Sequence, residues 1–370
     1  MNNFDSMTDK NIKSIYKELW DYELPGEIIK SWWKNGKKSQ DAKNSYQFLI
    51  EGVDYKNIKK TDEEKIYTSL SNIFHPISND FKNQLHAACF GDGNEYEKIM
   101  RLHSSSLCAL LIFCEVSENN PLPLTLNNQK YRFIKVLFEY KNMVITNPSN
   151  VDVVLIGKNE TTNQNVILFL ESKFTEYLTI NNTFKKLGTY YLDKKTEIYN
   201  DSFLEKIGIE IIKKHGTPLK FKSKENGKTK EYYGLQTINK SKTYIDGLKQ
   251  IISHYIGITN FISKPLYDER KDVFEKLNIK NAEIILGEIL FDFNFKNAKE
   301  CFEKYSDYYI KLAKQLNTLP DNILVLENLI KYSDIIADNN YKISDKVRDY
   351  YFNKSEQNDV QRPFRSKTSQ

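Results

Sequence analysis

Two apolar segments in the middle of the chain carry three charged residues whose types and spacing could do chemistry. Asp152 lies within VDVVLI (151–156), and Glu171 and Lys173 end the run VILFLESK (166–173). Both runs are rich in Val, Ile, Leu and Phe and flank a polar stretch, so they predict the two strands of a hairpin. An unpaired carboxylate on a strand that is apolar on both faces costs several kcal/mol, so a cation or hydrogen bonds must compensate each acid. A divalent metal ion would meet that need.

The spacing of these residues favours hydrolysis of a phosphodiester. Glu171 and Lys173 are two positions apart on one predicted strand, so they project from the same face, about 6 to 7 Å apart along it. Asp152 and Glu171 supply two carboxylates, which suit a hard ion such as Mg²⁺ that keeps several waters when the substrate brings phosphate oxygens. A lysine beside that ion can orient the attacking water or neutralise charge that develops in the transition state.

The pattern of Asp, spacer and Glu-x-Lys resembles that of the PD-(D/E)XK nuclease superfamily, which contains many restriction endonucleases and repair nucleases. The resemblance covers about residues 85–292, and segments such as FEYKNMVITNPSNVDVVL are similar to those of a poorly characterised bacterial branch. It implies an α/β fold with a restriction-endonuclease-like core, a mixed sheet flanked by helices in the order α-β-β-β-α-β. We therefore expect a helix at about 95–115, strands at about 132–139, 151–157 and 166–174, a helix at about 244–261 and a strand at about 283–292.

The resemblance also implies roles for single residues. Asp152 and Glu171 correspond to the metal ligands, with the Ser172 carbonyl as a further ligand, and Lys173 corresponds to the catalytic lysine. Glu139 resembles an additional upstream acid of the superfamily. The implied cofactor is Mg²⁺, for which Mn²⁺ can substitute, and the implied activity is endonucleolytic cleavage of double-stranded DNA in restriction or defence. A homodimer, a partner methyltransferase or a defence-system subunit would be the partners of such a nuclease.

Two features differ from the patterns of related nucleases. The proline of the superfamily's name does not directly precede the aspartate, because Pro148 lies four positions before Asp152. Gln250 and Tyr255 resemble the glutamine-and-tyrosine motif of the RecB-like nucleases, although their spacing is one residue longer. On that resemblance, Gln250 is a predicted substrate-binding residue.

Each of these assignments has an alternative. Lys173 could instead be a structural partner of Glu171 or Glu176, and Glu139 could be a solvated acid at the end of a strand. The chain could also be a nucleic-acid-binding or interaction protein with a degenerate nuclease fold, or a nuclease that acts on RNA, since a fold does not specify its substrate.

His103 and Ser104 are adjacent in the sequence, but a histidine beside a serine does not by itself predict acyl transfer. Neighbouring residues on a helix point about 100° apart, and the chain has no G-x-S-x-G sequence. The apolar residues that follow predict a buried helix, whose first residues either lie near a substrate phosphate or allow close packing. His103 and Ser104 therefore remain candidate substrate-binding residues. FGDGNE lacks the ending of a P-loop, and no Cys or His pair has zinc-ligand spacing.

A strongly basic stretch, KKHGTPLKFKSKENGKTK, occupies residues 213–230, where seven lysines accompany one acid, Glu225. Such a run can follow phosphates, each contact adding to a salt-dependent affinity, and Lys222 within it is a further candidate substrate-binding residue. The alternative is a solvated hairpin or an insertion. The whole chain has a net charge of only +5, so the predicted nucleic-acid substrate does not rest on global charge.

The composition and the order of segments set the predicted organisation. With 370 residues, of which 40% are hydrophobic, the chain can bury a sizeable core in about two lobes. We expect a helical region at 1–84, the core at 85–295 with an insertion at about 180–243, and C-terminal helices at 296–345, running from about 295 to 318 and from 321 to 338. Residues 346–370 are expected to form a flexible tail.

The sequence predicts neither export nor a membrane partner. The start MNNFDSMTDK lacks the basic and apolar regions of a signal peptide, and no run approaches the ~18 apolar residues that a membrane span needs. The four cysteines form no C-x-x-C pair, and two of them lie in apolar helical sequence, as reduced core cysteines do. We therefore expect a cytoplasmic protein.

Overall fold

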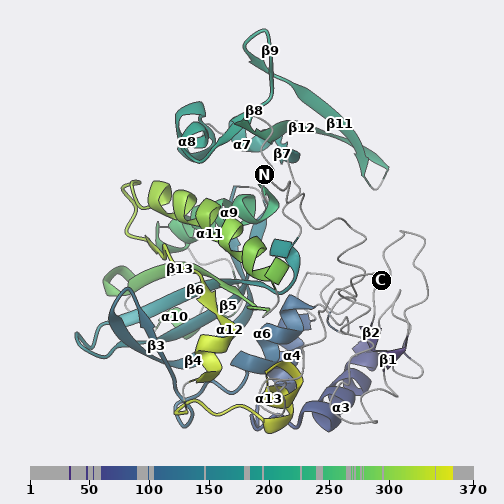
Figure 1. The fold of residues 1–370 in the computed structure, drawn as a ribbon, viewed down its shortest axis with the longest axis vertical. Coiled ribbons are helices and arrows are strands. Elements are labelled where there is room, and N and C mark those ends of the chain that lie inside the picture. The colour runs from purple at the N-terminus through teal and green to yellow at the C-terminus, as the bar shows by residue number, and fades with distance from the viewer. Residues whose placement is uncertain are drawn as a thin grey trace, which may run out of the picture.

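The fold is that of a computed structural model, which describes residues 33–34, 47–48, 53, 60–89, 99, 104–145, 147–178, 184–193, 196–225, 227–238, 245–263, 268, 270, 272–275, 277, 279–293, 296–337 and 339–352. These residues form one large mixed sheet with helices on both sides and one smaller sheet beyond helix α9 (Figure 1).

The large sheet has seven strands in the order β14-β13-β6-β5-β4-β3, with β15 also paired to β13. The pairs from β3 to β6 are antiparallel, whereas β13 runs parallel to β6, β14 and β15. The bounds are β3 (Leu122–Leu126), β4 (Gln129–Met143), β5 (Pro148–Asn159), β6 (Asn165–Lys173), β13 (Glu283–Leu290), β14 (Leu324–Val325) and β15 (Ile330–Lys331).

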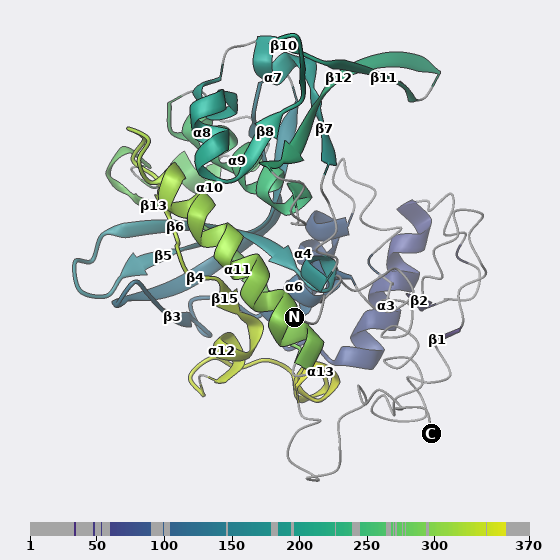
Figure 2. The same ribbon diagram turned by 45° about the horizontal axis from the view of Figure 1, so that its top comes forward.

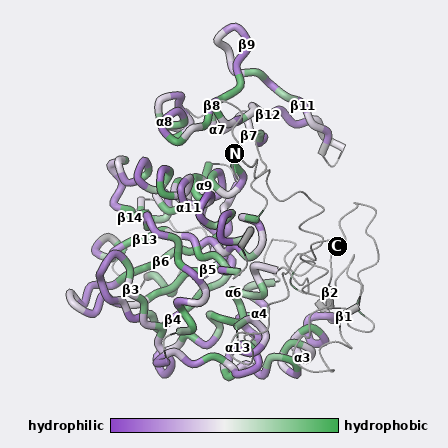
Figure 3. Tube along the Cα trace, viewed as in Figure 1, coloured by the Kyte–Doolittle hydropathy of each residue, from purple (hydrophilic) through white to green (hydrophobic). Residues whose placement is uncertain are grey.

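Two nearly continuous apolar strands form the centre of this sheet. β6 is buried at every position from Val166 to Lys173, and β13 at every position from Ile284 to Leu290. A strand with both faces covered has no reason to alternate apolar and polar residues, which is why Val166–Leu170 and Ile284–Leu286 read as continuous apolar runs. These strands are apolar along most of their length in Figure 3.

Helices cover the large sheet on both sides (Figures 1 and 2). α9 (Ile245–Ser263) packs on β4 and β5, and α11 (Lys296–Leu316) lies on the same side of the sheet. On the other side, α4 (Phe81–Cys89) packs on β4, and α6 (Ser105–Phe113) packs on β5 and β6. α6 is buried at every position from Leu107 to Phe113, as expected of a helix that is apolar all round.

A smaller, four-stranded antiparallel sheet follows β6 in the chain. Its order is β11-β12-β7, with β8 also paired to β12. The strands are β7 (Phe184–Gly188), β8 (Ile209–Ile211), β11 (Lys220–Glu225) and β12 (Lys228–Thr237), accompanied by η3 (Glu197–Tyr199), α7 (Thr189–Asp193), α8 (Asp201–Lys206) and a two-stranded pair of β9 (Lys213–Lys214) with β10 (Thr217–Pro218).

The remaining elements are short or lie near the ends of the chain. They are β1 (Trp33–Lys34), β2 (Gln47–Phe48), η1 (Lys60–Asp62), α3 (Glu63–Phe74), η2 (Glu176–Leu178), α10 (Asp272–Glu275), η6 (Ile279–Asn281), α12 (Tyr332–Ala337) and α13 (Asp345–Tyr351). Much of the region at 1–84 that the sequence predicts to be helical lies outside the described residues, which include the antiparallel pair β1–β2 and the helix α3.

The predicted α/β class, a mixed sheet flanked by helices, is confirmed. Within the described residues, α6, β4, β5, β6, α9 and β13 follow one another in the predicted order, and β3 is an additional strand between α6 and β4. No helix among the described residues is both long enough and apolar enough to span a membrane.

Two predictions near the C-terminus are wrong. The predicted helix at 321–338 is instead β14, β15 and the short helix α12, because its apolar residues pair with the outer edge of β13. The tail predicted from residue 346 begins inside α13, whose residues Val347 and Tyr350 are buried.

Candidate active site

The pairing of the strands brings four acidic residues into one row across the large sheet. Between β4 and β5, Phe138 pairs with Val153 and Tyr140 pairs with Val151. Glu139 and Asp152 lie between these two pairs, so they are opposite one another. Between β5 and β6, Val153 pairs with Leu170, so the next position places Asp152 opposite Glu171. Glu171 in turn pairs with Glu288 on β13. Residues opposite one another share a face of the sheet, so Glu139, Asp152, Glu171 and Glu288 form what we call the carboxylate row.

Glu139 has a backbone conformation that is unusual for a residue with a side chain. Its φ of 48° lies in the left-handed region, and such strain persists only where the surrounding structure holds it. Arg270 donates to the carbonyl oxygens of Phe138 (2.6 Å) and Glu139 (3.0 Å), while Asp268 accepts from the Lys141 amide (2.9 Å). Arg270 and Asp268 also form an ion pair of 2.7 Å. We call these two residues the strand clamp, because they fix β4 on both sides of Glu139.

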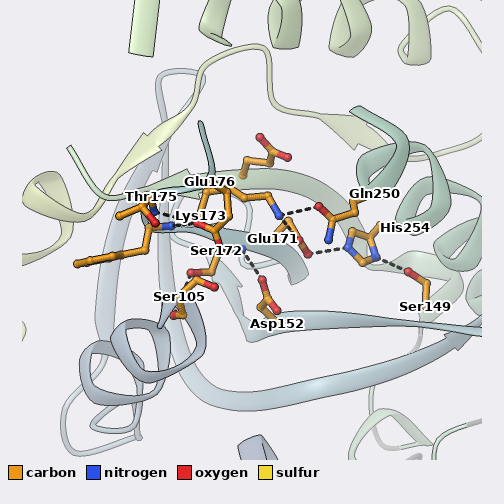
Figure 4. Close-up of polar contacts among 12 residues, drawn as sticks. Ser105, Ser149, Asp152, Glu171, Ser172, Lys173, Thr175, Glu176, Gln250 and His254 are labelled. Carbon is orange, nitrogen blue, oxygen red and sulfur yellow. Dashed lines mark hydrogen bonds and ion pairs between the residues drawn. The ribbon is translucent and has the colours of Figure 1, made fainter. Parts of the chain in front are cut away.

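Lys173 forms a buried ion pair with Glu171, its neighbour two positions earlier on the same strand face. The Lys173 Nζ donates to Glu171 Oε1 and also to Gln250 Oε1, the latter at 2.9 Å (Figure 4). Both Lys173 and Glu171 are 3% exposed, so this pair is shielded from water. Lys173 therefore pairs with Glu171 in this structure, and the predicted site residue Gln250 contacts Lys173 from α9.

His254 holds the second oxygen of Glu171. Its Nε2 lies 2.7 Å from Glu171 Oε2, and its Nδ1 lies 2.6 Å from the Ser149 hydroxyl (Figure 4). Burial by itself would raise the pKa of Glu171, but the Lys173 charge, His254 and their hydrogen bonds outweigh it and lower the pKa to about 2. Glu171 is therefore an ionised carboxylate whose two oxygens are both engaged.

Asp152 is in the opposite electrostatic situation. Burial raises its pKa well above the usual value, the nearby carboxylates of Glu171 and Glu139 raise it further, and Lys173 opposes the rise. Its Oδ2 accepts a hydrogen bond of 2.6 Å from the Ser172 amide. The Ser172 side chain points to the other side of the sheet, where its hydroxyl contacts the Ser105 carbonyl (3.3 Å) and the Tyr332 hydroxyl (2.7 Å).

Glu288 is the fully buried end of the carboxylate row. Its Oε2 accepts a hydrogen bond of 2.6 Å from the Tyr305 hydroxyl of α11, while its Oε1 is buried without a hydrogen-bond partner. Burial raises the pKa of Glu288 to about 8, although the Lys173 charge and the Tyr305 hydroxyl oppose the rise. Glu288 is therefore largely protonated at neutral pH.

Whether the carboxylate row suits a metal ion depends on the balance of its negative and positive charges. Among the described residues, no three His, Cys, Asp or Glu side chains are grouped as a ready metal site. The carboxylates of Glu139, Asp152 and Glu171 nevertheless outnumber the single lysine at this place, which is the imbalance that a hard divalent cation offsets. Asp152 and Glu171 carry the oxygen donors that such an ion takes, and Glu171 Oε1 is engaged by Lys173 in this structure.

The other candidate residues are placed apart from this group. Ser104 caps the N-terminus of α6, where its side-chain oxygen accepts from the Leu107 amide at 3.0 Å. Lys222 lies on β11 in the small sheet, and His103 lies outside the described residues. A groove of about 660 Å³ along β3, lined by residues such as Tyr131 and Leu329, contains no member of the carboxylate row.

Sequence reasoning missed two residues of this site. Glu288 was not singled out because the run EIILGEILFD predicts only a buried strand. His254 lies four residues after Gln250 and therefore shares its helix face, but its contact with Glu171 depends on how α9 packs. A buried acid in a strand and a histidine at that helical spacing are the signals that could have indicated them.

No protein-family model matches the chain, and no curated protein and no solved structure matches it either.

Proposed function

We propose that the chain is a metal-dependent nuclease that hydrolyses phosphodiester bonds in double-stranded DNA, with Mg²⁺ as its cofactor. The observation that carries the proposal is that Glu139, Asp152, Glu171 and Lys173 come together on one face of three adjacent strands. Three acids and a lysine on otherwise apolar strands bring no advantage to folding, whereas metal-dependent hydrolysis needs these groups.

In this proposal, Asp152 and Glu171 would hold the cation, and the half-buried Glu139 would lie beside it. Bound Mg²⁺ would supply Lewis-acid stabilisation of the phosphate and a more acidic water. His254 and Ser149 keep Glu171 Oε2 in place, so that Oε1 is presented to the cation in a fixed direction.

Lys173 has a second partner besides Glu171. If Glu171 Oε1 held the ion, the Lys173 ammonium would still have its hydrogen bond to Gln250 Oε1, which is 2.9 Å long. Gln250 thereby holds the charge near the reacting phosphate, where it can orient water or neutralise developing negative charge. Gln250 is thus a positioning residue for Lys173.

The test is cleavage of supercoiled plasmid and of linear duplex by purified protein, with Mg²⁺, Mn²⁺ or EDTA. We expect metal-dependent cutting that falls at least about 100-fold in Asp152→Ala and in Lys173→Ala. Asp307→Ala, which changes an exposed acid of α11, is the matched control and should cut normally. If folded Asp152→Ala cuts at the rate of the unmodified protein, Asp152 has no catalytic role. If the protein cuts only an RNA duplex, its substrate is RNA and not DNA.

A second function, nucleic-acid binding without catalysis, is favoured by one observation. Both oxygens of Glu171 are already engaged by Lys173 and His254, so the site is electrostatically satisfied at that residue without a metal ion. Calorimetric titration with Mg²⁺ separates the two functions. Uptake of Mg²⁺ that Asp152→Ala abolishes supports the nuclease, whereas DNA binding without any Mg²⁺ uptake supports the binding protein.

The biological setting proposed with this activity is restriction or defence against foreign DNA. Cutting both strands of a duplex requires two nicks, so a homodimer or a partner subunit fits that role. Measuring the molecular mass of the protein in solution, with and without duplex DNA, tests for the homodimer independently of cleavage.

A further inference from the structure

The hairpin formed by β11 and β12 extends away from the rest of the molecule (Figures 1 and 2). Its two strands pair from Lys220 opposite Tyr233 to Glu225 opposite Lys228. We call residues 220–231 the lysine ribbon. The ribbon contains five lysines and two glutamates, a net charge of +3, whereas the whole chain of 370 residues has a net charge of +5. More than half of the excess positive charge therefore lies on this one hairpin.

The two faces of the ribbon differ. Lys220, Lys222 and Lys224 alternate along β11, so they project from one face, and all three are exposed. The side chains of Lys220 and Lys222 are 51% and 71% exposed. Glu231 lies opposite Lys222 on this face, 3.4 Å from Lys220 and 3.8 Å from Lys222. The lysine face therefore keeps a net positive charge beside a single acid.

The opposite face of the ribbon carries Phe221 and Ser223, together with the exposed Lys230 opposite Ser223. Phe221 packs edge-on against Phe184 of β7, with ring centroids 5.5 Å apart. The Lys186 Nζ lies 5.6 Å from the centre of the Tyr232 ring and donates to the Ser223 hydroxyl at 3.1 Å. These contacts link β11 to β7 across β12, while Lys220, Lys222 and Lys224 stay exposed on the other face.

The small sheet is attached to the helix that supplies residues to the candidate active site. Lys185 of β7 forms an ion pair of 2.8 Å with Asp246 at the start of α9, and the Tyr191 hydroxyl lies 3.3 Å from the Ser253 hydroxyl. α9 also carries Gln250. A ligand held by the ribbon is thus connected to the site through one helix.

We propose that the lysine face of the ribbon binds the phosphate backbone of a DNA duplex outside the bond that is cut. Alternate residues of a strand are about 6.8 Å apart, so the three lysines span about 14 Å. Each strand of a duplex carries one phosphate per about 3.4 Å of its axis, so this span covers about four phosphates. The choice of DNA as the polymer rests on the proposed function, whereas the binding of a polyanion rests on the ribbon itself.

The experiment measures binding of a labelled 30-base-pair DNA duplex in EDTA, at several salt concentrations, so that cleavage does not contribute. The variant Lys220→Gln/Lys222→Gln/Lys224→Gln should bind at least about 10-fold more weakly at low salt, and the slope of log K against log salt should fall by about 2 to 3. The control Lys299→Gln/Lys311→Gln/Lys314→Gln removes the same charge from exposed positions of α11 and should stay within about twofold of the unmodified protein.

A variant that should strengthen DNA binding complements this test. Glu231→Gln removes the acid from the lysine face and should tighten binding about two- to fivefold. Equal losses in both lysine triples, an unchanged salt slope in the ribbon triple, or tighter binding of an RNA duplex of the same sequence would each overturn the proposal.

The outcome also separates this proposal from the nuclease. If the protein cuts DNA and the ribbon triple binds normally, the ribbon proposal fails while the nuclease stands. If no cutting occurs and the ribbon triple loses its affinity, the ribbon proposal stands without the nuclease.

Discussion

The carboxylate row and the lysine ribbon place charge in opposite environments. Lys173 is 3% exposed and contacts Glu171 and Gln250, whereas Lys222 is 71% exposed and has a distant partner in Glu231. Figure 3 shows the same contrast, since the middle strands of the large sheet are apolar while β11 is hydrophilic. A buried charge is fixed by particular neighbours and is costly to isolate, whereas exposed charges act together through a field that salt screens.

Removing the buried lysine should have the largest effect. Lys173→Met leaves Glu171 buried without its main counter-charge, so we expect a loss of about 3 to 5 kcal/mol in the free energy of unfolding, together with loss of cleavage. Urea unfolding followed by circular dichroism measures the first effect. Lys299→Met on the exposed face of α11 is the control, and a loss below about 1 kcal/mol in Lys173→Met would contradict the contrast between the two regions.

Neutralising Asp152 should act in the opposite direction on stability. Its raised pKa means that folding disfavours its charged form, so Asp152→Asn should increase the free energy of unfolding at neutral pH by about 1 to 3 kcal/mol. The amide oxygen can still accept from the Ser172 amide. Thermal unfolding of Asp152→Asn beside Asp307→Asn checks this expectation, and a destabilised Asp152→Asn would show that the acid is needed for folding.

Under the proposed function, His254 should affect the Mg²⁺ requirement of cleavage more than it affects folding. His254→Ala frees Glu171 Oε2, so we expect the Mg²⁺ concentration for half-maximal cleavage to rise about 10- to 100-fold. His254→Gln can restore a donor to the same oxygen and should recover most of the loss. The measurement is cleavage rate against Mg²⁺ concentration at saturating DNA, and equal defects in the two variants would exclude a role in orienting Glu171.

Glu288 should make stability depend on pH. The folded chain keeps a proton on Glu288 up to about pH 8, whereas the unfolded chain loses it near the ordinary pKa of 4.5. The stabilising contribution of that proton is therefore complete at the lower pH and is lost as pH rises to about 8. Urea unfolding across this window should show a flatter profile for Glu288→Gln than for Glu283→Gln, and parallel profiles would contradict the assignment.

The smallest effect is expected for the stability of the ribbon. The triple variant at Lys220, Lys222 and Lys224 removes three exposed charges, so its free energy of unfolding should change by no more than about 0.5 kcal/mol. Thermal unfolding at low and high salt measures this change. A loss comparable to that of Lys173→Met would mean that the lysines support the fold, and the contrast between the two regions would then fail.

Local sequence was sufficient to predict the strands and the charges within them. Asp152, Glu171 and Lys173 stand out because each interrupts an apolar run, and the alternation of a strand already puts Glu171 and Lys173 on one face. The lysine-rich segment was likewise recognised as a possible hairpin. These features depend on residues that are near one another in the chain.

The members that complete the site depend on packing between distant segments. Glu288 joins Glu171 only through the parallel pairing of β13 with β6, and His254 reaches Glu171 only through the rotation of α9 on the sheet. The error at 321–338 has the same origin. Its apolar residues suit a helix, but the open edge of β13 takes Leu324–Val325 and Ile330–Lys331 as parallel neighbours.

The strand clamp has a consequence for any attempt to redesign this protein. Arg270 and Asp268 follow Glu139 by about 130 positions in the chain, yet they hold the backbone conformation in which Glu139 faces Asp152. That conformation costs about 1 to 3 kcal/mol when nothing supports it. The connection between α9 and β13 is therefore an unsuitable place for a tag, a truncation or a graft, since altering it would disturb Glu139 and its neighbour Asp152 from a distance.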